Sequence, residues 1–275
     1  MKNKNTLRIV RLWLEGAVLL VLRFLQLQSG FDPATGLPVP FLAGTLVWVG
    51  LLACLAVELV LCFFRPKGGK RSFVCCFQPP WGAASAGLVT GAFLMIAGGA
   101  LLLVSVLPPR GAVEPAVKLT EAAAGVLGAA GGAGLLLLNK RLQGEGKPPV
   151  YPLLPAMFFS VLFVLSIYFR EKSNPVLERY YLIVLASVSG AYFLYRLSEF
   201  FRGEGSLRWF GLTADLSVVI CIAAAADFWK EPGRLLVDLS FAVTATVLLS
   251  LLRAEPLAEP EEEEPEETEE AGDPA

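Results

Sequence analysis

Residues 41–64 read FLAGTLVWVGLLACLAVELVLCFF, and Glu58 is the one charged residue in this stretch. A helix needs about 20 mostly apolar residues to cross the hydrocarbon core of a bilayer. Residues 83–107 form a second long stretch, and it carries no charge at all. Two such stretches exclude an ordinary water-soluble domain and predict an integral membrane protein.

The composition of the whole chain agrees with this prediction. The 275 residues are 55% hydrophobic and only 17% charged, with a mean hydropathy of +0.60, whereas a soluble domain carries roughly a quarter charged residues. The chain has no histidine, which excludes Ser-His-Asp and Cys-His nucleophile systems and His-ligated zinc or haem. We therefore expect a protein that is not an enzyme and that carries no cofactor or metal.

Eight segments approach the length of a spanning helix, so we predict an all-α bundle of about eight transmembrane helices. The first segment is weaker than the others because Arg11, Glu15 and Arg23 interrupt it, and a count of six or seven stays open. The segments are Ile9–Leu27, Phe41–Phe64, Ala83–Leu107, Lys118–Leu138, Leu153–Phe169, Tyr180–Leu197, Trp209–Phe228 and Leu235–Leu252.

Basic residues predict the orientation of the bundle, since cytoplasmic loops carry an excess of Lys and Arg. The connections that include both chain ends hold 15 Lys and Arg residues, and the opposite set holds seven. We expect both termini in the cytoplasm. Trp209 and Trp229 bracket the seventh segment, as interfacial aromatic residues do.

Charged residues inside the segments are the best pointers to function, because each costs about 2.5–3.5 kcal/mol at mid-bilayer on insertion scales. Helical rise places Glu15, Glu58 and Asp215 at similar depths, about 10 Å from the cytoplasmic surface. We interpret the intramembrane charges first as ion pairs that fix packing, in which Arg11 and Arg196 are partners on the same side. The alternative is a proton or cation site formed by these three carboxylates.

A second charged group lies toward the opposite surface and consists of Arg23, Glu121 and Asp238. In the ion-pair interpretation, Arg23 meets Asp238 across two helices. Neither pattern shows by itself whether the helices that carry these residues touch.

Segments three and four contain the small-residue pairs Gly87-xxx-Gly91 and Gly128-xxx-Gly132. Small residues at this spacing let helix backbones approach closely in lipid. We interpret them as packing faces of a tight hairpin or of an oligomer with a second copy or another membrane protein. A flexible or pore-lining glycine helix is the alternative.

The loop Gly30-Phe31-Asp32-Pro33-Ala34-Thr35-Gly36-Leu37-Pro38-Val39-Pro40 contains the turn formers Asp-Pro and Thr-Gly. It is a rigid connector or, through Phe31 and Asp32, an external recognition element. With the apolar helix that follows, residues 30–64 resemble uncharacterised polytopic membrane proteins of Clostridia-type bacteria. That resemblance implies a bacterial cytoplasmic membrane and supplies no activity.

The chain divides into a transmembrane domain over residues 1–254 and an acidic tail over residues 255–275. Eleven of the 25 acidic residues lie between Glu255 and Asp273, and a segment with so much like charge and so few apolar residues is expected to be disordered. The tail is a solvated appendage, a docking segment for a basic cytosolic partner or a weak binder of divalent ions. Its charge argues against nucleic acid as a partner.

Three functional interpretations follow. The first is a structural or accessory membrane protein. The second is a small secondary transporter coupled to protons or cations through Glu15, Glu58 and Asp215. The third is a membrane enzyme that acts on lipid substrates, against which the absence of histidine counts.

Overall fold

A computed structural model gives the fold as an all-α bundle, which confirms the predicted class. The structure describes residues 2–32, 37–39, 42–65, 69–107, 115–144, 149–171, 176, 180–229 and 231–253. The acidic tail, for which we predicted disorder, lies outside the described residues, as does part of the loop at residues 33–36 and 40.

Eight long helices make up the described bundle, together with two short helical elements. In chain order they are α1 (Lys2–Ser29), α2 (Leu42–Phe64), α3 (Phe73–Cys76), α4 (Ala83–Val106), α5 (Pro115–Leu142), the 3₁₀ helix η1 (Tyr151–Leu153), α6 (Leu154–Glu171), α7 (Tyr181–Phe201), α8 (Leu207–Ala224) and α9 (Pro232–Leu251).

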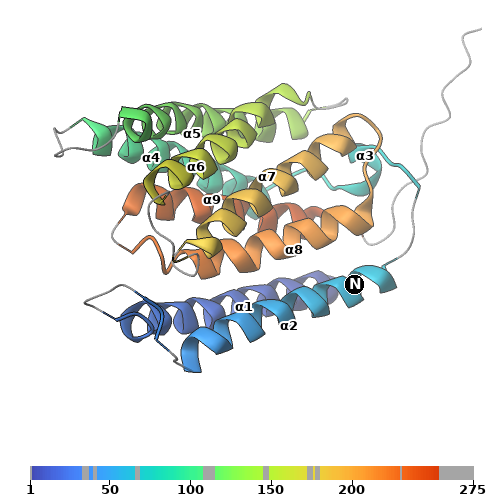
Figure 1. The fold of residues 1–275 in the computed structure, drawn as a ribbon. Coiled ribbons are helices and arrows are strands. Elements are labelled where there is room, and N and C mark those ends of the chain that lie inside the picture. The colour runs from blue at the N-terminus through green and yellow to red at the C-terminus, as the bar shows by residue number, and fades with distance from the viewer. Residues whose placement is uncertain are drawn as a thin grey trace, which may run out of the picture.

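The helices stack in layers, with α8 near the centre (Figure 1). The α1–α2 hairpin packs on one side of α8, and α7 and α9 pack on its other sides. Helices α4, α5 and α6 form the layer farthest from the hairpin, where α4 contacts α9 and α6 contacts α7. Within their apolar stretches, 78% of residues are buried in α8 but only 17% in α2. Helix α8 is therefore a core helix, and α2 lies at the periphery.

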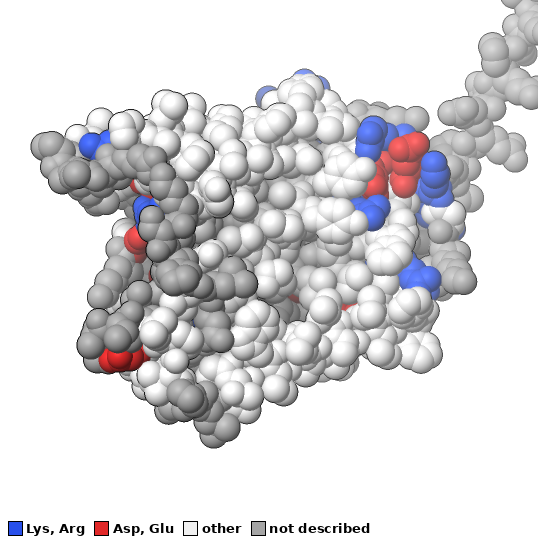
Figure 2. Space-filling model, in the orientation of Figure 1, with Lys and Arg blue, Asp and Glu red and all other residues white. Residues whose placement is uncertain are grey.

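Alternate crossings place the helix ends at two opposite ends of the bundle. We call the end at which α1 begins and α9 finishes the terminal end, and the other the hairpin end. Charged side chains gather at both ends, and mostly uncharged atoms cover the visible surface between them (Figure 2). This distribution is typical of a protein whose middle band faces lipid.

Seven of the described helices are long and apolar enough to cross a membrane, namely α2 and α4 to α9. The chain is thus a multi-pass membrane protein, and segments two to eight of the sequence prediction are confirmed as such helices. Helix α1 has the length but falls outside this set, since Arg8, Arg11, Glu15 and Arg23 lower its hydropathy. Its crossing remains a prediction.

Glycines set the spacing between α4 and its two neighbours. A Cβ atom added to Gly132 would lie 2.6 Å from the Ala92 carbonyl oxygen, and one added to Gly99 would lie 2.5 Å from the Ala129 amide nitrogen. Gly128 also faces α4, with 3.2 Å between its added Cβ and the Gly99 Cα. The Gly128-xxx-Gly132 pair therefore packs inside an α4–α5 hairpin.

The second small-residue pair, Gly87 and Gly91 on α4, faces α9. Added Cβ atoms at Gly87 and Gly91 would lie 2.5 Å from Val247 Cγ2 and 2.6 Å from Thr244 Oγ1, both on α9. The Ser240 hydroxyl donates to the Gly91 carbonyl oxygen at 2.7 Å. Both small-residue pairs thus pack within one chain, but only Gly128-xxx-Gly132 lies in a hairpin; Gly87-xxx-Gly91 packs α4 against α9.

The segment between α2 and α4 closes the terminal end. Around α3, Arg71 exchanges backbone hydrogen bonds with Gly205, at 3.0 and 3.1 Å. The amide of Arg253 donates to the Cys76 carbonyl at 2.8 Å. Phe73 and Phe77 are buried and contact Phe200, Phe201 and Phe210. Buried aromatic rings and main-chain pairing fix this segment beneath the ends of α7, α8 and α9.

Candidate functional site

The three inner carboxylates lie in one cluster at the terminal end, in which Glu58 and Asp215 are buried and Glu15 is partly exposed. We call it the terminal cluster; its members come from α1, α2 and α8, and Arg65 directly follows α2. They are Arg8, Arg11, Glu15, Glu58, Arg65 and Asp215.

Asp215, on the core helix α8, is the centre of the terminal cluster and is fully buried. Arg8 donates from Nε to Oδ1 at 2.9 Å and from Nη2 to Oδ2 at 2.6 Å. Arg65 Nη2 donates to the same Oδ2 at 2.5 Å. A bidentate arginine and a second cation thus neutralise a carboxylate that would otherwise be costly to bury.

A glycine makes room for the two guanidinium groups. A Cβ atom added to Gly211 would lie 2.2 Å from Arg65 Nη1 and 3.1 Å from Arg8 Nη2. The Gly211 carbonyl oxygen also accepts a hydrogen bond from Arg8 Nη2 at 3.0 Å. A larger residue at this turn of α8 would displace both arginines from Asp215.

Glu58 is the second fully buried acid of the terminal cluster. Arg11 donates to its Oε1, and Arg65 Nη2 lies 3.7 Å from its Oε2. Arg11 Nε also lies 3.5 Å from Glu15 Oε1, one helical turn away on α1. Three arginines therefore face three acids, and the formal charges of the cluster balance.

Hydrogen bonding in the terminal cluster is incomplete even though its charges balance. Within the described part of the chain, Glu15 Oε2, Glu58 Oε2, Arg11 Nε and Arg65 Nη1 are buried without a hydrogen-bond partner. Unsatisfied buried polar atoms are unusual in folded proteins and mark a strained or functional position. The cluster is thus tightly paired around Asp215 and looser around Glu58.

The structure pairs Arg23 differently from the expectation. This fully buried arginine faces Asp227 rather than Asp238, donating from Nη2 to Asp227 Oδ1 at 2.6 Å. It also donates to Gln26 Oε1 at 2.8 Å and lies 5.1 Å from the centre of the Tyr181 ring. Helix α8 ends at Ala224, earlier than the predicted Phe228, and the turn that follows presents Asp227 to α1.

Glu121, the second member of the outer group, joins a four-residue network at the hairpin end. Arg170 and Arg234 both donate to Glu121 Oε1, the latter at 2.6 Å. The same two arginines lie 2.9 and 2.8 Å from the carboxylate of Glu231. Arg170, Glu231, Arg234 and Asp227 line a small polar pocket of about 200 Å³.

Arg196 lies apart from these networks, and Asp238, one turn after Arg234 on α9, forms no ion pair with a described residue. Asp238 is buried on α9, and its Oδ2 has no hydrogen-bond partner in the described ranges. Arg196, expected near the three acids, instead donates to Glu199 on its own helix at 2.9 Å and contacts Tyr192. It belongs to an aromatic group on the outside of α7 rather than to the terminal cluster.

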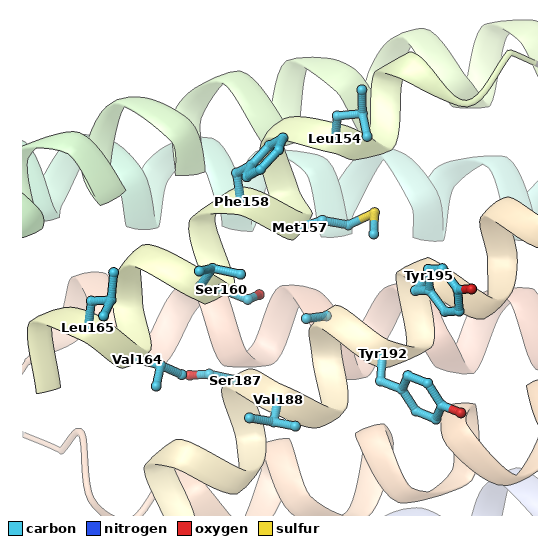
Figure 3. A pocket seen from close by; sticks show the side chains of 12 residues that line it. Leu154, Met157, Phe158, Ser160, Val164, Leu165, Ser187, Val188, Tyr192 and Tyr195 are labelled. Carbon is cyan, nitrogen blue, oxygen red and sulfur yellow. The ribbon is translucent and has the colours of Figure 1, made fainter. Parts of the chain in front are cut away.

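An apolar groove lies between α6 and α7 and has a volume of about 520 Å³ (Figure 3). Leu154, Met157 and Phe158 from α6 face Tyr192 and Tyr195 from α7 across it. A second groove of about 270 Å³ lies on the other side of α7, against α2 and α8. Both grooves have an almost wholly apolar lining, in contrast to the pocket at the hairpin end.

The arginines Arg8 and Arg65 are the main residues that sequence reasoning missed in the terminal cluster. Both count among the 15 Lys and Arg residues that predict the orientation of the bundle, because they stand at the ends of apolar segments. Long arginine side chains at such positions can reach inward as well as outward. Among the described residues, no group of three His, Cys, Asp or Glu side chains is placed to hold a metal ion.

Comparison with protein-family models, curated proteins and solved structures finds no match to this chain. Its function is therefore argued from its own residues.

Proposed function

We propose that this multi-pass membrane protein is a non-enzymatic structural or accessory component of a bacterial cytoplasmic membrane. One observation carries the proposal: Asp215, the most centrally placed buried acid, has both oxygens occupied by Arg8 and Arg65. A carboxylate held in this way is suited to fixing helices rather than to releasing and taking up an ion. The terminal cluster then serves to hold the α1–α2 hairpin on α8.

A charge exchange between Arg11 and Glu58 tests this role. The single variants Arg11→Glu and Glu58→Arg bring like charges together in a buried site, so we expect membrane abundance and melting temperature to fall. The double variant restores an opposite pair, and we expect it to recover most of both. Single variants as stable as the parent protein, or a double variant that recovers neither quantity, would overturn the structural role.

A transporter coupled to protons or cations is the second candidate, and one observation favours it. Glu15, Glu58 and Asp215 come from three elements and meet in one cluster, where Glu15 Oε2 and Glu58 Oε2 accept no hydrogen bond from the described residues. Such oxygens are the places where a proton or cation would bind. Flux into proteoliposomes across a panel of ions and metabolites tests it: flux abolished by Glu58→Gln without loss of folding would replace the structural proposal.

We further propose that α1 crosses the membrane and that both chain ends face the cytoplasm. The excess of Lys and Arg on the connections of the terminal end supports this orientation. Single cysteines at Leu37, at the hairpin end, and at Arg202, at the terminal end, would test it with an impermeant maleimide on intact cells. We expect labelling at position 37 alone; labelling at 202 alone would reverse the orientation, and labelling at both would place one connection wrongly. A cysteine at Asn5, at the start of α1, should stay unlabelled, and its labelling together with position 37 would remove α1 as a span.

A further inference from the structure

Two apolar grooves flank α7 and share a ridge between them. Val188 and Tyr192 line both grooves, the larger toward α6 and the smaller toward α2 and α8. The hydroxyl groups in the lining do not make it polar, because Ser160, Ser187 and Ser189 donate to backbone carbonyl oxygens of their own helices, at 3.3, 3.1 and 2.9 Å. Two neighbouring grooves of this kind suit a pair of hydrocarbon chains.

Aromatic and cationic side chains stand at the terminal end of these grooves. Tyr192, Tyr195 and Trp209 are each about two-fifths exposed, as expected for aromatic residues at the boundary between lipid and water. The guanidinium carbons of Arg196 and Arg208 both lie 6.0 Å from the centre of the Trp209 ring. The two arginines therefore flank one interfacial tryptophan.

Arg208 supplies a positive charge that the described part of the protein leaves unbalanced. Its guanidinium lies 4.5 Å from the Phe63 ring, its Nε is buried without a hydrogen-bond partner, and no described carboxylate forms an ion pair with it. Arg196, in contrast, is paired with Glu199. A ligand bound to both arginines would thus meet one net positive charge, which favours an anion, and arginine matches phosphate oxygens with two donors at once.

The spacing along the helices connects these cations to the grooves. Arg196 follows Tyr192 by one turn of α7, or about 6 Å of rise. Arg208 precedes Thr213, which lines the smaller groove, by five residues of α8, or about 7.5 Å. A phosphate beside Trp209 would therefore stand roughly one helical turn beyond the mouth of each groove.

We propose that one anionic phospholipid straddles α7, with an acyl chain in each groove and its phosphate bound by Arg208 and Arg196. The inference rests on the proposed function in one respect, that the protein resides in a membrane. It adds a specific lipid site that the structural role does not require. Basic side chains at a membrane surface favour anionic headgroups, and the two grooves require a lipid with two chains.

Native mass spectrometry and thermal shift of the purified full-length protein in detergent test the proposal. The probes are phosphatidylglycerol, phosphatidylcholine, lysophosphatidylglycerol and inorganic phosphate. We expect phosphatidylglycerol to bind at least fivefold more tightly than the other three. Equal binding of phosphatidylcholine would remove the charge argument, equal binding of the one-chain lipid would remove the straddling geometry, and competition by millimolar phosphate would indicate a free-anion site instead.

Matched variants locate the lipid on the protein. Arg208→Gln should reduce the preference for phosphatidylglycerol at least fivefold, while Arg202→Gln, an exposed arginine at the same end, should leave it unchanged. Ala191→Trp should fill the larger groove and bring phosphatidylglycerol down to the affinity of its one-chain form. Equal effects of the two glutamine variants, or unchanged binding by Ala191→Trp, would overturn the assignment.

A separate measurement distinguishes failure of the lipid-site proposal from failure of the proposed function. Carbonate extraction of cell membranes reports integration of the protein independently of any lipid preference. Protein that stays in the membrane pellet but shows no lipid preference would overturn the lipid site alone. Protein released into the supernatant would overturn the membrane assignment and the lipid site together.

Discussion

The two sides of the bundle hold their helices together by different means. The α1–α2 hairpin is attached to α8 through buried ion pairs, which centre on Asp215 and Glu58. Helix α4 is attached to α5 and α9 through glycines that bring backbones into contact, such as Gly99 and Gly132. Helix α4 carries no charged residue, whereas the first interface combines its ion pairs with glycines such as Gly16, which faces Ile222 on α8.

The difference follows from what holds helices together in lipid. The hydrophobic effect gives little there, because lipid tails are as apolar as the side chains, so close packing or polar contacts must supply the attraction. Glycine faces supply packing over a long contact but specify the position along the helix only loosely. Ion pairs specify it strictly, because a shift of one turn leaves a buried charge without its partner.

The largest effect should come from Asp215→Ala. The change leaves Arg8 and Arg65 without their shared carboxylate, and removal of one partner from a buried pair costs about 3–5 kcal/mol. We expect membrane abundance and the melting temperature in detergent to drop sharply. An unchanged melting temperature would show that the α1–α2 hairpin is held by apolar contacts alone and would break the comparison.

Gly99→Ala should have the next largest effect. The new methyl group would lie 2.5 and 2.7 Å from backbone atoms of Ala129 and Gly125, and backbone cannot move aside without separating α4 from α5. Overpacking of this kind costs about 1–3 kcal/mol. Thermal unfolding followed by size-exclusion chromatography would measure it, and a gain in stability would contradict the glycine-built interface.

Gly87→Ala tests the other glycine contact of α4, with α9, which should tolerate an added methyl group better. Its added Cβ would meet Val247 Cγ2 at 2.5 Å, and a side-chain methyl group can shift where a backbone atom cannot. We expect a loss smaller than that of Gly99→Ala, at or below about 1 kcal/mol. A larger loss than at Gly99, in the same unfolding assay, would place the tighter contact at the α4–α9 interface.

Lys70→Ala should have the smallest effect and serves as the reference for ion pairs. Lys70 lies 3.5 Å from Glu204 at the surface, with side chains 76% and 51% exposed. Exposed pairs contribute about 0–1 kcal/mol, so we expect no resolvable change in melting temperature. A loss as large as that of Asp215→Ala would show that buried and exposed ion pairs contribute equally to stability.

The sequence was sufficient to predict the helices and the shared depth of the three inner acids. Apolar length fixes a span, and helical rise fixes the depth of a charge, but neither shows that the helices carrying Glu15, Glu58 and Asp215 touch. The arginine partners could not be predicted, because Arg8 and Arg65 stand at helix ends where the side chain can extend either way. Helix α1 also begins at Lys2, before the predicted Ile9, which brings Arg8 into the helix.

Local sequence patterns could not predict which helices contact each other. Gly87-xxx-Gly91 and Gly128-xxx-Gly132 look alike in the sequence, yet the first faces α9 and the second faces α4. Arg23 pairs with Asp227, in the turn after Ala224, and not with the expected Asp238. Such choices depend on how distant segments are arranged, which spacing along one helix does not encode.

The distance along the chain between Arg8 and Asp215, 207 residues, has a consequence for biogenesis. At a synthesis rate of about 5–20 residues per second, roughly 10–40 s pass between the emergence of the arginine and that of its carboxylate. During that interval Arg8 has no acidic partner, whereas Arg11 can already pair with Glu58 inside the hairpin. Docking of the hairpin is then a late step of maturation, and the seventh long helix to be made is the one that completes it.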